Sequence, residues 1–159
     1  MSIKEFHLFH GALLTQLVRS ERPLTLRMIE TRATDSWSTY RINNEINLVA
    51  KHSLNPRKLA RVKGGISWSF VFSKSQMKQV ASSDAWAALI CGAAKLTAPM
   101  GICLLNPDEI RTLLDTSIMD QQSLTVRSEP RKQFRVKSSR ADELLVPVGR
   151  VQEWDVPGS

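Results

Sequence analysis

The chain has 159 residues, of which 42% are hydrophobic and 23% charged, and its formal net charge is +7 at pH 7. This length suits one domain with a hydrophobic core of its own and is short for two domains. The longest apolar run, AWAALICGAA, is about half as long as a membrane-spanning helix, and the N-terminus lacks the apolar core of a signal peptide. We therefore expect a soluble, cytoplasmic protein with no membrane partner.

The first third of the chain predicts a helix followed by a meander of strands. Apolar residues recur at helical spacing in MSIKEFHLFHGALLTQLVRSERP, which is typical of an amphipathic helix. Alternating apolar residues predict one strand in LTLRMIET and two more in STYRINNEINLVAKHS. We expect a turn at Asn43 and Asn44 between the last two strands.

A basic segment follows these strands. SLNPRKLARVKGG contains Arg57, Lys58, Arg61 and Lys63 and no acid, within a region from residue 46 to residue 83 that lacks Asp and Glu altogether. A localised group of cations attracts polyanions, whereas the same charge spread evenly mainly favours solubility. The excess positive charge therefore points to a partner for this segment.

The rest of the chain predicts alternating helices and strands and then a hairpin. AALICG and GICLL are apolar on both faces, which is typical of central strands, and we expect Cys91 and Cys103 within them to be buried and unreactive. Asn106 with Pro107 marks the start of a helix. The expected elements in chain order are SWSFVFS (strand), SKSQMKQVA (helix), AALICG and GICLL (strands), NPDEIRTLLD (helix) and SLTVRSEPRKQFRVKSS (hairpin).

This order of elements indicates an α+β fold. We expect a mixed β-sheet with the N-terminal amphipathic helix and one or two further helices packed on it. We assign residues 1–145 to this single domain and residues 146–159, which show little pattern, to a C-terminal tail. An unpaired strand edge would be able to pair with a second copy, but the sequence does not identify that strand or the oligomeric state.

Residues 3–105 resemble, in the order of their elements, the core of the restriction-endonuclease-like, or PD-(D/E)XK, superfamily. The resemblance implies carboxylates on neighbouring strands that hold a divalent ion, with an acid two residues before a lysine. Lys51 is the only lysine suitably placed on an early strand, and Val49 occupies the position of that acid. Glu30, Asp35 and Glu45 are the nearest substitutes. We therefore expect the fold without catalysis and without a cofactor, and Mg²⁺ enters only if these acids meet at Lys51.

The three histidines do not form a recognisable catalytic or metal site in the sequence. His7 and His10 flank the apolar stripe of the first helix with no Cys or third His nearby, so we interpret them as packing residues rather than zinc ligands. His52 ends a predicted strand, where it would act as an acid or base only if a carboxylate oriented it. We interpret His52 as a histidine beside solvent.

The basic segment is the feature on which we base the expected function. Arginine and lysine neutralise phosphates and release counterions, and an aromatic ring near them can stack on an unpaired base. Trp68 is such a ring, although its alternation with Phe70 and Phe72 also fits a core residue. We expect a non-catalytic module that binds the phosphate backbone of DNA or RNA. The alternatives are an interaction subunit that docks on a larger protein complex and a divergent metal-dependent nuclease. The candidate binding residues are Lys51, Arg57, Lys58, Arg61, Lys63 and Trp68.

Overall fold

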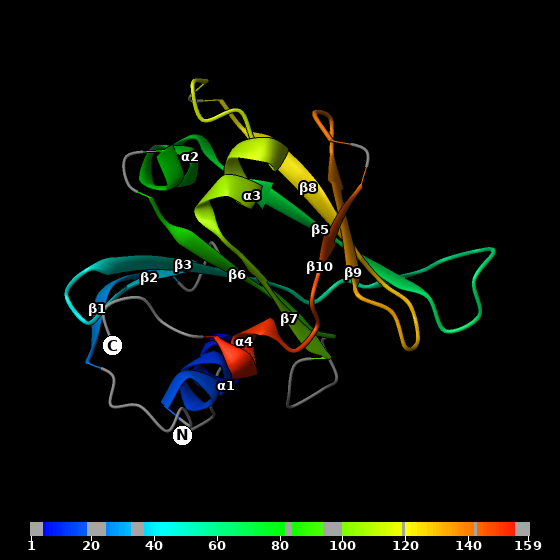
Figure 1. Ribbon diagram of the computed structural model, residues 1–159, viewed down its shortest axis with the longest axis horizontal. Coiled ribbons are helices and arrows are strands. Elements are labelled where there is room, and N and C mark those ends of the chain that lie inside the picture. The colour runs from blue at the N-terminus through cyan, green and yellow to red at the C-terminus, as the bar shows by residue number, and fades with distance from the viewer. Residues whose placement is uncertain are drawn as a thin grey trace.

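The computed structural model describes residues 5–18, 25–32, 37–81, 84–93, 100–118, 120–141 and 143–154. Within these ranges the chain forms ten strands, arranged in two five-stranded sheets, and four helices (Figure 1). The expected α+β class with a mixed sheet is confirmed. No helix in the described part of the chain is long and apolar enough to cross a membrane.

The first sheet, called sheet A, is mixed and has the strand order β1-β2-β3-β6-β7. The first three strands form an antiparallel meander, β6 runs parallel to β3, and β7 is antiparallel to β6. Asn43 and Asn44 have φ angles of 54° and 58°, which is the left-handed conformation that a tight hairpin turn requires, so the predicted turn is confirmed. The strands are β1 (Leu26–Arg32), β2 (Trp37–Ile42), β3 (Ile46–Ser53), β6 (Trp86–Cys91) and β7 (Gly101–Leu105).

The second sheet, called sheet B, is antiparallel throughout and has the order β10-β9-β8-β5-β4. In β5, Trp68, Phe70 and Phe72 are buried and alternate with more exposed residues, because successive side chains of a strand point to opposite faces. The strands are β4 (Arg57–Lys58), β5 (Ile66–Phe72), β8 (Gln122–Ser128), β9 (Phe134–Ser138) and β10 (Leu144–Val146).

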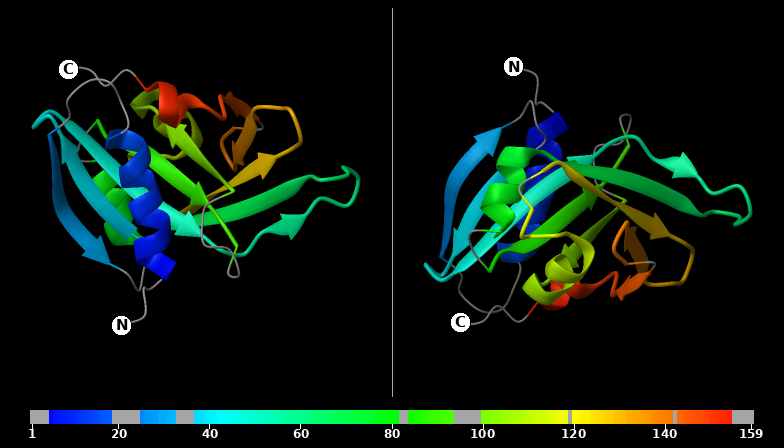
Figure 2. Two further views of the ribbon diagram at one scale, coloured as in Figure 1. Left: turned by 90° about the horizontal axis from the view of Figure 1, so that it is seen from below. Right: turned by 90° about the horizontal axis from the view of Figure 1, so that it is seen from above.

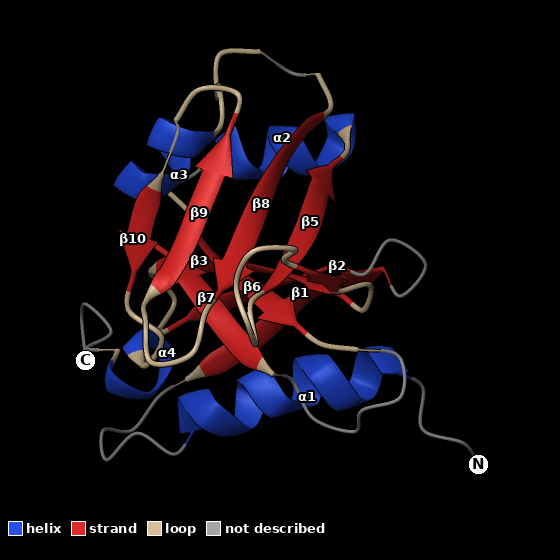
Figure 3. Cartoon of the chain, turned by 90° about the vertical axis from the view of Figure 1, so that its right-hand side faces the viewer, coloured by secondary structure: helices blue, strands red, loops and turns tan. Residues whose placement is uncertain are grey.

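Apart from its edge strand β1, sheet A is covered on both faces, which explains its apolar strands. One face packs on sheet B, with α2 (Lys74–Ala81) and α3 (Pro107–Leu113) closing the end of this core. The other face packs on α1 (Glu5–Val18) and α4 (Arg150–Glu153), as Figure 3 shows. Cys91 and Cys103 lie in the first core as free, fully buried thiols, and burial raises the pKa of both.

Two expectations about the end of the chain and the sheet order were wrong. β7 is an edge strand of sheet A rather than a central one, and the guanidinium of Arg150 donates a hydrogen bond to the Leu104 carbonyl at 3.0 Å. Residues 146–154 belong to the domain rather than to a tail, and residues 155–159 lie outside the described residues. Val146, Val151 and Trp154 are all buried, and the Trp154 ring lies 4.7 Å from the ring of Trp86.

Candidate nucleic-acid interface

The basic segment folds into a hairpin that projects from the body of the molecule. Arg57 and Lys58 of β4 lie opposite Ser67 and Ile66 of β5, and the hairpin extends past sheet B in the views of Figures 1 and 2. Its turn is held by backbone hydrogen bonds, one of them from Leu59 N–H to the Gly65 carbonyl at 2.9 Å. Residues 58–66 also enclose a shallow hollow of about 550 Å³ on the hairpin.

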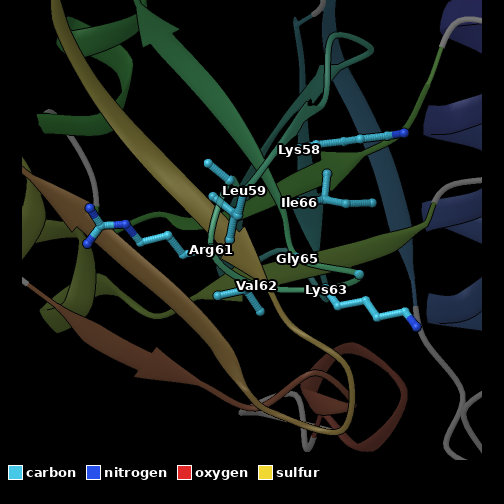
Figure 4. A pocket seen from close by; sticks show the side chains of 9 residues that line it. Lys58, Leu59, Arg61, Val62, Lys63, Gly65 and Ile66 are labelled. Carbon is cyan, nitrogen blue, oxygen red and sulfur yellow. The ribbon is translucent and has the colours of Figure 1, made fainter.

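The four cations of this hairpin do not point in one direction. All four are exposed, and Figure 4 shows Arg61 directed away from Lys58 and Lys63. Gly64 adopts a φ of +77°, which favours glycine and lets the chain reverse between Lys63 and β5. The hairpin therefore carries positive charge on both of its sides.

A second hairpin, formed by β8 and β9, adds cations beside the first. Arg127 lies opposite Ser67 on one side and opposite Arg135 on the other, and Ser67 lies opposite Arg57. Residues directly opposite each other in an antiparallel sheet share a face. Arg57, Arg127 and Arg135 therefore form one row across sheet B, and Lys137 joins the same face opposite Thr125.

The ends of the two hairpins touch. The β8–β9 turn carries Arg131 and Lys132, and a Cβ atom added to Gly64 would lie only 2.9 Å from Cγ of Pro130 in this turn. The tip of the first hairpin is thus supported by the second. We call the combined feature the basic surface, and it consists of Arg57, Lys58, Arg61, Lys63, Arg127, Arg131, Lys132, Arg135 and Lys137.

The described residues of the basic surface carry a large excess of positive charge. Two acids are paired within it: Glu129 lies 3.2 Å from the ammonium of Lys132, whose hydrogen bond holds the Glu129 pKa below its usual value, and Glu143 lies 3.1 Å from Arg135. The nine cations and these two acids sum to +7, which equals the net charge of the chain, because the other 13 basic and 13 acidic residues of the sequence cancel.

The sequence interpretation missed the five cations of the second hairpin. Their signal was present, because Thr125, Arg127, Arg135 and Lys137 occupy the polar positions of two alternating strands. Counting charge along the chain concealed them, since Glu129 and other acids are close in sequence. Only the pairing of β8 with β5 brings these cations beside the first hairpin.

Two of the candidate binding residues lie apart from the basic surface. Trp68 is 2% exposed, and its indole N–H donates to the Gly92 carbonyl at 2.9 Å, so the ring belongs to the core and cannot stack on a base. Lys51 projects between the sheets, donates to Gln76 of α2 at 3.0 Å, and lies 6.0 Å from the ring of Phe72 at the far end of β5.

The candidate carboxylates are not gathered at Lys51 in the described part of the chain. Glu45 is exposed in the β2–β3 turn, about 20 Å along β3 from Lys51. Glu30 is located on β1, opposite Thr39 of β2, and Asp35 lies outside the described residues. Among the described side chains no three His, Cys, Asp or Glu residues form a group able to hold a metal ion.

A buried polar cluster joins α1 to sheet A, and the sequence interpretation missed it. The His10 ring lies 2.6 Å from the Ser38 hydroxyl through Nδ1 and 2.9 Å from Nδ1 of His52 through Nε2. His10 is 2% exposed, and His52, at 9%, is buried rather than beside solvent as expected. One ring nitrogen of the His10–His52 bond must be an unprotonated acceptor.

We expect this cluster to make the protein less stable in acid. Burial, followed by the charge of Lys51, lowers the pKa of His52 in the folded chain. The unfolded chain then binds the proton more readily, so the stabilisation is complete above about pH 6.5 and declines as the pH falls through the folded-state pKa. Urea unfolding between pH 7.5 and 5 should show a loss approaching about 1.4 kcal/mol per pH unit.

A residue far from the cluster provides the control for this experiment. His52→Asn should lower stability at neutral pH and flatten the acid dependence, whereas Val71→Ala on the exposed face of sheet B should retain the slope because the His10–His52 bond remains. Equal pH slopes for the parent and His52→Asn would show that this cluster is not the acid-sensitive element.

Comparison of the chain with protein-family models, curated proteins and solved structures gave no match. The geometry is therefore the basis for a function. Of the features of the described residues, the basic surface combines excess charge and a projecting shape with exposure of all its cations except Arg127 and Arg135, which are half-buried, whereas the histidine cluster is buried.

Proposed function

We propose that the chain is a non-catalytic nucleic-acid-binding module that holds the phosphate backbone with its basic surface. The observation that carries this proposal is the concentration of nine cations on two adjoining hairpins. Cations gathered in this way release condensed counterions when they contact phosphates, and each contact adds to the affinity. The same charge distributed over the molecule would not favour one surface for a polyanion.

The row of arginines on sheet B is suited to phosphate contacts. Arg57, Arg127 and Arg135 span three strand spacings, about 14 Å, over which duplex DNA carries about eight phosphates. The guanidinium fork can donate two parallel hydrogen bonds to a phosphate, which fixes orientation as well as charge. Ser67 and Thr125 lie between the cations, and their small side chains leave the backbone of a ligand room to approach.

The salt dependence of binding tests this function. We expect the affinity for a duplex of about 30 base pairs to fall with added salt, with a log-log slope of roughly −4 or steeper, since each phosphate contact contributes just under one. Fluorescence anisotropy on two unrelated base sequences would measure it. Nearly equal affinities are expected for both, because backbone contacts carry no sequence information. Absence of binding at 50 mM salt would refute the proposal.

A second candidate function is docking on a larger protein complex. Met28 and Ile29 are each 54% exposed and adjacent on β1, whose only partner among the described strands is β2. Exposed apolar residues on an edge strand can pair with a protein partner. In that case the basic surface would contact acidic groups of the partner, and binding to arbitrary nucleic acid would be weak at any salt concentration.

A further inference from the structure

We propose that the ligand of the basic surface is double-stranded DNA and that the β4–β5 hairpin enters its major groove. This inference rests on the proposed function and names its substrate class. It depends on three features of the molecule: which aromatic side chains are exposed, the dimensions of the hairpin, and the directions of its cations.

The described surface lacks a platform on which unpaired bases would stack. Among the aromatic side chains whose exposure is described, Trp86 is half-buried against Trp154 and the others are buried. On the outer face of sheet B, the side chains of β5 and β8 are small hydroxyl residues and Val71, next to Arg127. Proteins that bind single strands without sequence preference rely on aromatic stacking in addition to cations. A duplex, whose bases are already stacked, is the ligand that this surface fits.

The dimensions of the hairpin fit the major groove of B-form DNA. Two strands about 4.8 Å apart, with their side chains, form a ribbon of the size that the groove, about 12 Å wide, admits. β5 stays paired with β8 as far as Ile66 and Ser128, so the part of the hairpin that is free to enter the groove, about 8.5 Å deep, is the turn from Leu59 to Gly65, which projects beyond the β8–β9 turn in Figure 1. The DNA minor groove, about 6 Å wide, and the deep, narrow major groove of A-form RNA would exclude the ribbon.

The cations are arranged for a groove with a phosphate strand on each side. Arg61 points to one side of the hairpin and Lys58 and Lys63 to the other (Figure 4), so an inserted hairpin would face both phosphate walls. At the base of the hairpin, Arg127 and the rest of the sheet B row would contact the backbone that flanks the groove. Packing at Gly64 and Gly65 holds the tip, so little conformational entropy is lost on insertion.

Methylation by dimethyl sulfate distinguishes the grooves in one experiment, because the reagent modifies guanine N7 in the major groove and adenine N3 in the minor groove. With the full chain bound to a 30-base-pair DNA duplex, we expect protection of guanine N7 and little protection of adenine N3. We also expect at least about tenfold tighter binding to this duplex than to the RNA duplex or the single strand of the same sequence, since only B-form DNA admits the ribbon.

Two variants with the same change in charge test whether the β4–β5 hairpin is the element that lies in the groove. Arg61→Gln with Lys63→Gln should abolish the guanine N7 protection at saturating protein, whereas Lys74→Gln with Lys78→Gln on α2 removes the same charge and should leave it unchanged. Equal affinity for the RNA duplex, or protection confined to adenine N3, would overturn the groove assignment and leave the proposed function standing. Failure to bind all three ligands at 50 mM salt would overturn both.

Discussion

Replacing Arg57, Lys58, Arg61 and Lys63 together by glutamine is expected to weaken duplex binding by about 1,000-fold at 0.1 M salt, because about four phosphate contacts are lost. The log-log salt slope should become shallower by about 3 to 4 for the same reason. The loss should be similar for unrelated base sequences. The thermal midpoint should hardly change, since all four side chains are exposed and exposed charges contribute little to stability.

The chain offers a control with the same composition of charge. Arg27, Arg41, Lys74 and Lys78 are also two arginines and two lysines, are exposed, and lie on β1, β2 and α2, away from the basic surface. Their replacement by glutamine lowers the net charge from +7 to +3, as in the hairpin variant, and should cost much less affinity. Equal losses in both variants would mean that total charge, rather than its location, determines binding.

The same pair of variants separates the two proposed functions. If the hairpin variant binds duplex as well as the parent does but no longer binds a protein partner, the basic surface is a docking element. The salt slope of the hairpin variant is informative as well. If binding by the hairpin variant still depends on salt, but less steeply than binding by the parent, the remaining dependence reflects contacts made by the β8–β9 hairpin. Arg127, Arg135 and Lys137 are unchanged in that variant.

Local patterns in the sequence predicted most of the individual elements. The alternation of Trp68, Phe70 and Phe72, the Asn43–Asn44 turn and the helix start at Asn106 and Pro107 each act within a few residues, and the structure contains them all. The apolar runs AALICG and GICLL correctly indicated strands covered on both faces, but not their position. Coverage of both faces does not distinguish a central strand from an edge strand such as β7 that α4 and β10 adjoin.

The features that the sequence did not reveal depend on contacts between distant segments. The single sheet that was expected is two sheets, because β5 pairs with β8 rather than with β3 or β6. The same pairing creates the basic surface from segments about 60 residues apart, and only the register shows that Arg57 and Arg127 share a row. Val146 and Trp154 have no periodic pattern around them, so their burial could not be inferred from spacing.

The effect of Trp68 substitutions on stability shows whether this ring is a core residue or a stacking residue. Trp68→Ala is expected to lower the free energy of unfolding by about 3 to 5 kcal/mol, because it leaves a cavity between the sheets and an unsatisfied Gly92 carbonyl. Trp68→Phe should cost less, since most of the volume remains and only the hydrogen bond and part of the ring are lost. Urea unfolding followed by circular dichroism would measure both.

Binding by the same variants completes the test of Trp68. Folded Trp68→Phe should bind duplex with the parent's affinity and salt slope, because the indole is enclosed between the sheets and does not reach the basic surface. Val71→Ala is a suitable control on the same strand: Val71 is 42% exposed on the outer face of sheet B, so its loss should change stability by less than about 1 kcal/mol. A Trp68→Ala protein with unchanged stability and weakened binding would place the ring at the ligand instead, and the packing of β5 against sheet A would have to be revised.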